Sequence, residues 1–257
     1  MLTDRRHEQI VRHVRRHGSA AVGELSAAFA VSEATIRRDL EALAGRNLVR
    51  RVRGGACDVR SSIRPEADVR SFADVAGTAT AAKQTIARRA CELVHDGDVI
   101  ALDIGTTVAA MCPLLVDRSL TVVTASMAVV RELAAAPDVD VVVLGGLLRP
   151  NYDSLVGTLT EAALRQVRVD LAFLGTSGVR GDGAVLDSTP SEVPVKRGLL
   201  DAASRSYLLA DSEKFPGSGF LEVARLDRFA GVITDRAPFP YDLGSDDEGT
   251  TVEVLYP

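Results

Sequence analysis

Residues 32–43 read SEATIRRDLEAL and are typical of a short amphipathic helix. On a helical wheel with 100° per residue, Ile36, Leu40 and Leu43 fall within an arc of 60°. Ser32 is a good N-cap, because its hydroxyl accepts a backbone N–H of the first helical turn. The stretch therefore predicts a helix that begins within a residue or two of Ser32 and packs one apolar face on a core.

The opposite side of this helix carries two adjacent arginines, Arg37 and Arg38. Outward arginines are either solvated surface or a surface that binds an anion. Residues 1–60 contain twelve arginines and seven carboxylates, about +5, whereas the remaining 197 residues contain 18 basic and 28 acidic side chains, about −10. A small basic part joined to a large acidic part indicates an anion-binding module attached to an unrelated body.

Two further helices are predicted before this one, at residues 4–17 and 20–29. Only two or three residues separate the second helix from the third, and such a short connection forces a steep crossing, as in a helix-turn-helix. The predicted core of this part consists of Ile10, Val11, Val14, Val22, Leu25, Phe29, Ile36 and Leu40.

The third helix is followed by LVRRVRGGACDVR, residues 48–60, in which apolar and basic residues alternate. The Gly54-Gly55 pair suits a hairpin turn, so the stretch predicts a basic β-hairpin, the wing of a winged helix-turn-helix. Arg51 and Arg53 are expected near its tip, where they would reach a phosphate backbone or a minor groove.

These motifs resemble the N-terminal signature of the DeoR family of bacterial transcription regulators. The resemblance rests on Arg6, Ile10, Val14, the run from Thr35 to Leu40 (TIRRDL) after Ser32, and the wing RVRGGA. It implies binding to a double-stranded DNA operator, with arginine offering a bidentate fork to guanine or a contact to phosphate. Asp39 is expected to hold a neighbouring arginine or backbone N–H. The candidate DNA-binding residues are Ser32, Thr35, Arg37, Arg38, Arg51, Arg53 and Gly54.

Residues 61–78 lack periodicity and are predicted to be a linker, which divides the chain into a DNA-binding domain at 1–60 and a second domain at 79–257. In the second domain, apolar strands of four to six residues alternate with helices, which predicts a mostly parallel α/β sheet covered on both faces. The predicted strands are VIALD at 99–103, TVVTA at 121–125, VDVVVLGG at 139–146, DLAFLG at 170–175, SYLLAD at 206–211, GVITD at 231–235 and TVEVL near the C-terminus.

Ligands of such sheets bind beyond the carboxyl ends of the strands. Three predicted strands end in small polar residues, and hydroxyls and N–H groups at a helix start can bind an anion. These strand-end residues are Asp103, Gly105, Thr106 and Thr107, then Thr124 and Ser126, then Gly145, Gly146 and Arg149.

The second domain resembles the DeoR-family sensor domain, whose fold is similar to ribose-5-phosphate isomerase and which typically binds phosphorylated sugars. The resemblance rests on Lys83, the DIGTT motif at 103–107, Gly145-Gly146, Gly157, Asp170, Glu192, Lys196, the DSEKF motif at 211–215 and ITD at 233–235. It adds Glu192, Lys196, Asp211 and Lys214 to the candidate effector-binding residues. Glu192 and Lys196 also fit an ordinary surface ion pair at i,i+4. The family commonly has Asn where this chain has Ala125, so the effector is expected to differ.

Other classes of protein and site are disfavoured by composition. No window approaches 18 uninterrupted apolar residues and no secretion signal stands at the N-terminus, so we expect a cytoplasmic protein without a membrane span. The three cysteines are scattered, which predicts neither a disulfide framework nor a metal site. No cofactor is expected.

The sequence thus predicts a DNA-binding regulator, a repressor of a sugar or carbohydrate operon that responds to a phosphorylated sugar. Because helix-turn-helix proteins commonly read two half-sites, we expect a homodimer or homotetramer. An aldose-ketose isomerase with a DNA-binding appendage is the alternative, with Asp103, Glu192 or Asp211 as the general base. A protein-protein module without DNA binding is disfavoured by the basic first domain.

Overall fold

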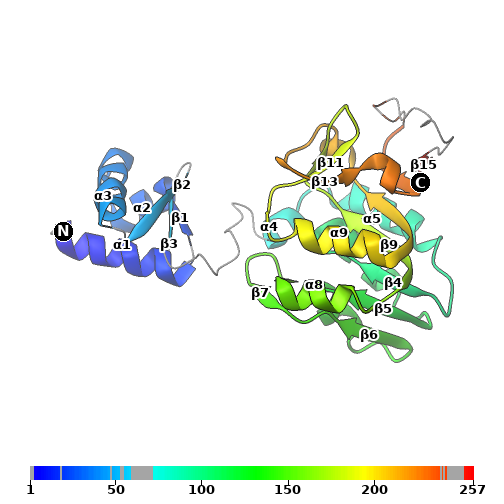
Figure 1. Ribbon diagram of the computed structural model, residues 1–257. Helices are drawn as coiled ribbons and strands as arrows, with labels where there is room; N and C mark the ends of the chain where they lie inside the picture. Colours follow the sequence, from blue (N-terminus) through cyan, green and yellow to red (C-terminus); the bar gives the residue numbers. More distant parts are fainter. Residues whose placement is uncertain are drawn as a thin grey trace. The chain divides into compact units, whose positions relative to one another are not determined.

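The chain divides into two compact units, an N-terminal unit of residues 1–69 and a C-terminal unit of residues 70–257 (Figure 1). The computed structural model describes residues 3–17, 19–46, 48–52, 55–58, 72–237, 239, 241 and 252–257.

The N-terminal unit consists of three helices and a small antiparallel sheet with the strand order β1-β3-β2. Its elements are α1 (Thr3–His17), β1 (Ser19–Ala21), α2 (Val22–Phe29), α3 (Glu33–Gly45), β2 (Val49–Val52) and β3 (Gly55–Asp58). The arrangement is a winged helix-turn-helix, as the sequence predicts. The prediction of a helix over 20–29 was wrong at its start, because Ala20 and Ala21 belong to β1, which pairs with β3.

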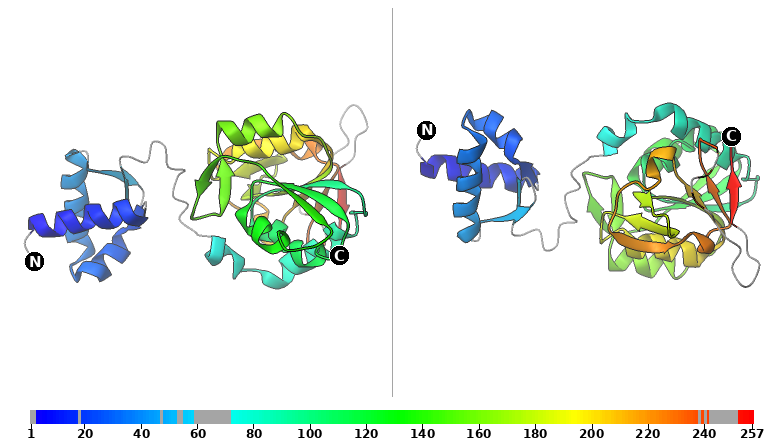
Figure 2. Two further views of the ribbon diagram at one scale, coloured as in Figure 1. Left: turned by 90° about the horizontal axis from the view of Figure 1, so that it is seen from below. Right: turned by 90° about the horizontal axis from the view of Figure 1, so that it is seen from above.

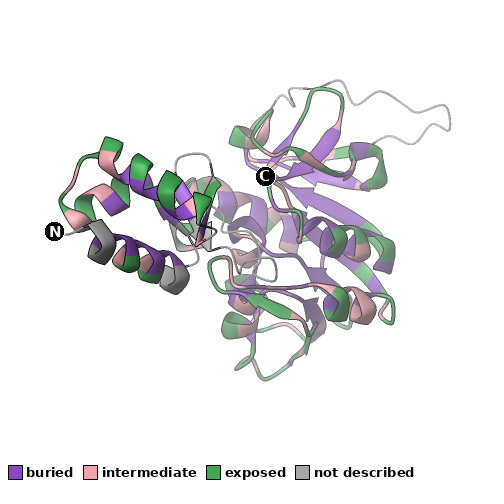
Figure 3. Ribbon diagram, turned by 60° about the vertical axis from the view of Figure 1, so that its left-hand side comes forward, coloured by how far each residue is buried: buried purple, intermediate pink, exposed green. Residues whose placement is uncertain are grey.

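The core of this unit is formed by the predicted apolar faces of the three helices. Ile10, Leu25, Ile36 and Leu40 are all fully buried in one cluster, against which Phe29 packs. The alternation of buried and exposed residues along the helices is visible in Figure 3. Helix periodicity therefore identified this core correctly.

The turn between α2 and α3 spans three residues, Ala30 to Ser32. Ala30 ends α2 in the left-handed region, with φ 51°, and its N–H donates to Ser26 O. The Ser26 hydroxyl donates to Val31 O at 2.6 Å, which holds the turn closed. Ser32 caps α3 by accepting a hydrogen bond from Thr35 N. The short connection and the N-cap are both as predicted.

The predicted hairpin is formed by β2 and β3. Val52 pairs with Gly55, so Gly55 is the first residue of a strand and not part of the turn, which corrects that assignment. Arg53 and Gly54 lie outside the described residues.

The C-terminal unit is built on a parallel seven-stranded sheet with the order β15-β14-β12-β9-β4-β5-β6. All seven predicted strands are present in it. They are β4 (Val99–Leu102), β5 (Leu120–Thr124), β6 (Val139–Val143), β9 (Val169–Gly175), β12 (Ala203–Leu209), β14 (Gly231–Ile233) and β15 (Glu253–Leu255).

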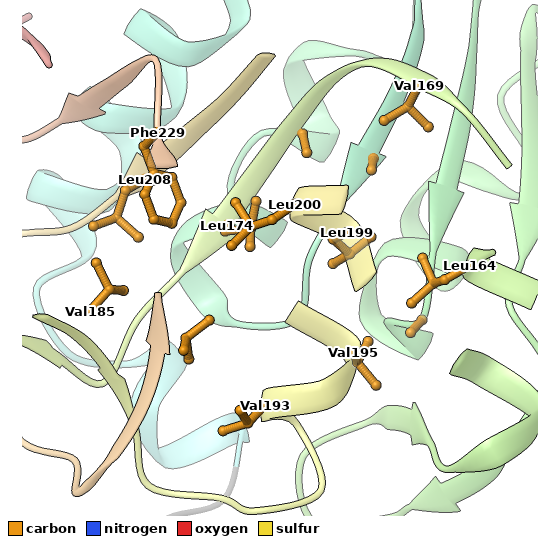
Figure 4. Packing of buried hydrophobic residues seen from close by; sticks show 14 of the residues in the cluster. Leu164, Val169, Leu174, Val185, Val193, Val195, Leu199, Leu200, Leu208 and Phe229 are labelled. Atoms are coloured by element: carbon orange, nitrogen blue, oxygen red, sulfur yellow. The ribbon is translucent and has the colours of Figure 1, made fainter. Parts of the chain in front are cut away.

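Helices pack on both faces of this sheet (Figure 2). The helices of this unit are α4 (Phe72–Ala76), α5 (Thr80–Cys91), α6 (Thr106–Ala109), α7 (Met127–Leu133), α8 (Thr158–Leu164) and α9 (Val193–Ala202), with the 3-10 helices η1 (Cys112–Leu114), η2 (Ser212–Lys214) and η3 (Leu226–Arg228). Successive side chains of a strand point to opposite faces, so Ala172 and Leu174 join the core beneath α8 and α9. Leu171 and Phe173 join the core beneath α5, α6 and α7. Figure 4 shows the first of these cores, which includes Leu174 of β9 and Leu199 of α9.

Two short antiparallel sheets were not predicted. One is a hairpin of β7 (Leu147–Arg149) and β8 (Ser154–Val156). The other joins β10 (Gly178–Val179), β11 (Ala184–Asp187) and β13 (Leu221–Arg225).

The prediction of a linker over residues 61–78 was wrong at its C-terminal end. Its last part contains α4, whose Phe72 N–H donates to Asn151 O at 2.9 Å. Residues from Phe72 onward therefore belong to the fold of the C-terminal unit, whereas residues 61–71 lie outside the described residues.

The strand order reverses between β4 and β9. From β4 the chain continues through β5 to β6 on one side, and it then returns to β9 on the other side of β4. In open α/β sheets this reversal opens a crevice at the carboxyl ends of the two central strands. Asp103 and Gly175 occupy those two ends.

Candidate functional site

The exposed face of α3 carries the predicted DNA-binding side chains. Arg37 and Arg38 are both exposed, while Ile36 and Leu40 on the other face are buried. Arg37 forms an i,i+4 ion pair with Glu33 at 2.8 Å, with both side chains more than half exposed. Such a pair contributes little to stability, so the guanidinium can exchange Glu33 for another partner.

Ser32 and Thr35 lie at the N-terminal end of the same helix. Their hydroxyl oxygens are 2.9 Å apart, and Ser32 Oγ also accepts the Thr35 N–H. Ser32 is exposed and Thr35 half-buried. The two hydroxyls therefore stand together at the positive end of the helix dipole, where a phosphate group binds favourably.

Asp39 is buried beneath this face and holds α1 against α3. Arg6 donates to both of its oxygens, at 2.6 and 3.0 Å, and His7 Nε2 lies 2.9 Å from Asp39 Oδ1. Burial alone would raise the pKa of Asp39, but the hydrogen bonds from Arg6 and His7 outweigh it and hold that pKa below its usual value. The expected structural role of Asp39 is confirmed, and its partners come from a helix 33 and 32 positions earlier in the chain.

Arg51, the described arginine of the predicted wing set, is exposed on β2. Its Nη1 donates to the backbone carbonyl of Arg37 at 3.0 Å. The wing strand is therefore tied to the backbone of α3 at Arg37.

At the strand reversal of the C-terminal unit, Lys196 reaches from α9 to the end of β4. Its ammonium group donates to Asp103 Oδ2 and to Gly175 O, and Asp187 Oδ2 lies 3.7 Å away. Lys196 and Asp103 are 2% and 1% exposed. Burial disfavours the charged ammonium, but the carboxylates of Asp103 and Asp187 together outweigh this effect and raise the pKa of Lys196.

A second buried network lies at the N-terminal end of α9. Arg149 of β7 donates to Glu192 Oε1, which also accepts from Ser154 Oγ at 2.6 Å. Glu192 is 1% exposed. The interpretation of Glu192 and Lys196 as a surface ion pair was wrong, because both side chains are buried. Glu192 instead pairs with Arg149, and Lys196 pairs with Asp103.

Thr124 is the last residue of β5 and Ser126 follows that strand, and both side chains stabilise the fold. Thr124 Oγ1 donates to Leu102 O at 2.7 Å and accepts the Ser126 N–H, which ties β5 to β4. Ser126 Oγ caps α7 by accepting the Val129 N–H. Neither side chain was assigned this role from the sequence.

Gly145 and Gly146 connect β6 to β7. The Thr160 hydroxyl donates to Gly145 O at 2.6 Å. A Cβ on Gly146 would lie 2.1 Å from Thr160 Oγ1, so a larger residue would clash there. These glycines allow close packing of the turn on α8.

The DSEKF motif forms the 3-10 helix η2 after β12. Asp211 is buried and caps this turn by accepting the Glu213 N–H at 3.1 Å. Lys214 is half-buried at the end of the turn. Neither Asp211 nor Lys214 lines the cavity described below.

A cavity of about 330 Å³ lies between α4, α5 and α6. Of the predicted effector residues, only Thr106 is among the residues that line this cavity. Asp103, Gly105 and Thr107 belong to the same DIGTT motif but do not line it. Gly105 has φ 113°, a conformation that favours glycine, and it directs the chain from β4 into α6. The remaining lining residues are Phe72, Ala76, Thr80, Lys83, Gln84, Arg88, Ala109, Ala110, Pro113 and Leu114.

Two cations of this cavity, Lys83 and Arg88, were not among the predicted site residues. Lys83 is buried and donates to Val75 O at 2.6 Å and Thr78 O at 2.7 Å, so it also fastens the end of α4. Arg88 is exposed on α5. Lys83 is one of only three lysines in a chain with 30 basic residues, a signal that could have placed it in the site.

Two negative findings apply to the residues that the structure describes. Within them, no three His, Cys, Asp or Glu side chains are grouped so as to hold a metal ion. None of the described helices has the length and hydropathy needed to cross a membrane.

A helix-turn-helix with an exposed basic recognition face, joined to an α/β unit with a ligand-sized cavity, defines a ligand-responsive transcription regulator. The DeoR-like helix-turn-helix domain model matches residues 6–61, and the DeoR C terminal sensor domain model matches residues 78–236. The chain belongs to the DeoR family of transcription regulators.

Several curated relatives cover nearly the whole chain. The glycerol-3-phosphate regulon repressor of Escherichia coli (strain K12) is 33% identical over 239 residues, which cover 93% of both chains. The L-fucose operon activator of Haemophilus influenzae is 32% identical over 90% of this chain and 92% of its own. The putative aga operon transcriptional repressor of Escherichia coli O157:H7 is 32% identical over 91% of this chain and 86% of its own.

Solved structures match part of the chain at low identity. A D-ribose-5-phosphate isomerase in complex with phospho-erythronic acid is 18% identical, covers 52% of each chain and has a TM-score of 0.39. The delta subunit of eIF2B from Chaetomium thermophilum is 18% identical, covers 62% of this chain and 57% of its own, and has a TM-score of 0.42. At these TM-scores the likeness carries no conclusion about ligand or activity.

Proposed function

We propose that this regulator represses an operon of carbohydrate metabolism and that a phosphorylated sugar controls its binding to the operator. The observation that carries the proposal is the cavity of about 330 Å³ between α4, α5 and α6. Its volume lies at the lower end of the range for small-molecule sites, which suits a ligand of the size of a sugar phosphate.

Three side chains of the cavity lining are suited to an anion. Lys83 and Arg88 supply positive charge, and Thr106 supplies a hydroxyl. A phosphate group interacts favourably with all three. The glycerol-3-phosphate regulon repressor, which is 33% identical, is named for a compound of this class.

The position of the cavity suggests how a ligand would act on DNA binding. Phe72 and Ala76 of α4 form part of its wall, and α4 is the first described element of the C-terminal unit. A ligand shifts DNA affinity only by its differential affinity for two states. In this proposal the effector favours one arrangement of α4, and that arrangement changes the affinity of the chain for its operator.

The predicted DNA-binding residues complete the proposal. Arg37 and Arg38 read bases or phosphates, Ser32 and Thr35 bind phosphate at the helix start, and Arg51 supports them from the wing strand. The chain binds two half-sites as a homodimer or homotetramer. We propose repression rather than activation because two of the relatives described above are named repressors.

We also propose that the chain does not convert its effector. Two of the candidate general bases, Asp103 and Glu192, are each held in a buried ion pair, with Lys196 and Arg149. A general base must reach the proton that it removes. The expected result is no formation of ribulose 5-phosphate from ribose 5-phosphate by the purified chain, and measurable turnover would contradict this part.

Thermal unfolding of the full chain with single candidate ligands tests the effector proposal. The panel contains glycerol 3-phosphate, glucose 6-phosphate, unphosphorylated glucose and inorganic phosphate. A ligand present at 100 times its Kd stabilises the folded state by about 2.7 kcal/mol. For a domain of this size the Tm then rises by roughly 5–10 °C. We expect this rise with a phosphorylated member alone.

A pair of adjacent arginines provides the matched control. Arg88 lines the cavity, whereas Arg89 is paired with Glu92 at 2.6 Å. Arg88→Ala should reduce the rise in Tm and Arg89→Ala should leave it unchanged. Equal stabilisation by phosphorylated and unphosphorylated sugars, or equal responses of the two variants, would contradict the proposed site.

A further inference from the structure

The outward face of α3 carries a carboxylate, Glu41, to which no role has been assigned. The buried side chains of α3 mark the side of the helix that faces the core; they are Ile36, Asp39, Leu40 and Leu43. On a wheel with about 100° per residue, Ala34, Arg38 and Glu41 fall within an arc of about 60° centred opposite this buried set. All three are exposed. Glu41 therefore points away from the core as squarely as Arg38 does.

The exposed residues of this face have the spacing with which a recognition helix reads bases. Relative to Ala34, the exposed residues Arg37, Arg38 and Glu41 stand at i+3, i+4 and i+7. The base-reading side chains of the homeodomain recognition helix have the same spacing, because these positions follow one another along one side of a helix. When this face lies in a major groove, the carboxylate of Glu41 meets the base edges one turn after the two arginines.

A carboxylate on this face needs a compensating contact, because the DNA phosphates repel it. The compensating group in a major groove is an N–H donor on a base edge. Cytosine presents its N4 amino group there, and a glutamate side chain accepts a hydrogen bond from it. Guanine presents only acceptors, and adenine presents its N6 donor beside the N7 acceptor, which repels a carboxylate. Of the four bases, cytosine therefore fits Glu41 best.

We propose that Glu41 determines part of the operator sequence by accepting a hydrogen bond from the N4 amino group of a cytosine. Arg37 and Arg38 carry the guanidinium groups that fit guanine, so the cytosine lies in the same half-site as the guanine that they read. The inference rests on the proposed role of α3 as the recognition helix, and on no property of the C-terminal unit.

Glu33, a second exposed carboxylate of α3, differs from Glu41 in direction. It lies about 110° from the centre of the outward arc. Its Oε2 accepts a hydrogen bond from Arg37 at 2.8 Å, and a Cβ on Gly23 of α2 would lie 3.8 Å from its Oε1. The Glu33 carboxylate therefore lies toward α2 and is engaged within the protein. A substitution there removes the same charge from the same helix and leaves the outward arc unchanged.

Selection of duplexes from a random-sequence pool by the full chain tests the inference with the variant Glu41→Gln. Glutamine has a similar helix propensity to glutamate, and Glu41 is exposed, so the fold is retained, which thermal unfolding checks. A glutamine amide both donates and accepts, and it fits N6 and N7 of adenine. We expect the wild-type chain to select cytosine at one position of each half-site and Glu41→Gln to select adenine there. The control Glu33→Gln should select the wild-type sequence.

Titration of two selected duplexes that differ only at this position gives the size of the effect. One duplex has a C·G pair there and the other has an A·T pair. The wild-type chain should bind the C·G duplex at least about fivefold more tightly than the A·T duplex, which is the lower range for one mismatched base pair. Glu41→Gln should reverse this order, and Glu33→Gln should keep it.

A gain in affinity of Glu41→Gln that is equal for every duplex would show that the carboxylate acts only through its charge, and would overturn the inference. An unchanged selected sequence, or an equal change in Glu33→Gln, would overturn it as well. The variant Arg38→Ala separates this failure from a failure of the proposed recognition helix. If Arg38→Ala alters the selected bases and Glu41→Gln does not, this inference alone is removed. If neither variant alters them, the proposed role of α3 is removed with it.

Discussion

The candidate site residues of the two units differ in where their charges lie. On α3 of the N-terminal unit, Arg37 and Arg38 are exposed, whereas in the C-terminal unit Lys196 and Arg149 are each 2% exposed and paired with carboxylates. A charge that binds a partner has to remain accessible to it. A buried ion pair gains little net stability because both charges lose their hydration, but breaking it is costly, so it fixes one packing arrangement.

Helix α3 contains both a buried structural charge, Asp39, and exposed charges. Asp39 is buried and bound by Arg6 and His7, while its neighbour Arg38 is exposed. The buried anion fixes α3 on α1, and the exposed cations of α3 are thereby presented in a defined orientation. The comparison teaches that position relative to the core, rather than residue type, separates binding charges from structural ones.

The largest effect is expected from the buried pair of the C-terminal unit. Lys196→Met leaves Asp103 as a buried unpaired carboxylate and should lower the free energy of unfolding by about 3–5 kcal/mol. Urea unfolding of the full chain measures this. The matched control is Arg228→Met, which breaks an exposed pair with Asp201 and should cost about 0–1 kcal/mol. Similar losses in the two variants would remove the distinction between the two kinds of charge.

Asp39→Asn is expected to have the next largest effect. It weakens charge-assisted hydrogen bonds from Arg6 and His7, and should lower the stability of the N-terminal unit by about 2–3 kcal/mol. Because the folded-state pKa of Asp39 is depressed, its contribution is present above the unfolded pKa of about 3.9 and is lost as the pH falls through the folded pKa.

The stability of the wild-type N-terminal unit should therefore decrease as the pH falls below about 4, and Asp39→Asn should show less of this decrease. Circular dichroism during acid titration of both proteins provides the measurement. Identical acid transitions would show that the Arg6–Asp39–His7 network does not stabilise the fold.

Substitution of the exposed arginines should affect binding and not folding. The DNA probe is a duplex that the wild-type chain selects from a random-sequence pool. Arg38→Ala should weaken binding to this selected duplex by about 2 kcal/mol if Arg38 contacts a base bidentately, and Arg37→Ala should have an effect of similar sign. Arg165→Ala, an exposed arginine of the C-terminal unit, is the control for net charge and should leave the affinity unchanged. Wild-type affinity in both α3 variants would exclude this face as the recognition surface.

The smallest expected effect concerns Thr106 in the cavity. Thr106→Val removes the hydroxyl and nearly keeps the shape, so the response to effector should require about tenfold more ligand, or roughly 1.4 kcal/mol. DNA affinity without effector should stay at the wild-type value. A response curve that coincides with wild type would show that the DIGTT motif only forms a turn.

Local patterns predicted much of the fold. The seven sheet strands are apolar runs of the chain, and α3 has both an N-cap and an apolar face, so each is recognisable from a few neighbouring residues. The hairpin β7–β8 and the sheet of β10, β11 and β13 were not predicted, because their strands have two to five residues and β11 pairs with a strand 34 or more positions later. Helix α4 has five residues, too few to show a helical period.

The candidate site was less predictable for a related reason. The partners of its charged groups are distant in the sequence, with 93 positions between Asp103 and Lys196 and 43 between Arg149 and Glu192. Residue type at a strand end could not show whether a side chain faces a ligand or a buried counter-ion. Thr124 and Ser126 are polar residues at a strand end, but their hydrogen bonds are to backbone groups. Lys83 lines the cavity from within α5, so a search restricted to strand ends misses it.

Titration of the selected DNA duplex with the full wild-type chain, with and without the phosphorylated sugar that raises its Tm, tests the central claim most directly. The account predicts tight, salt-dependent binding without the sugar and an affinity at least about fivefold lower at saturating sugar, the lower range of allosteric coupling. Unphosphorylated sugar should leave the affinity unchanged. Equal affinity with and without a sugar phosphate that demonstrably binds the chain would contradict the claim that this cavity controls DNA binding.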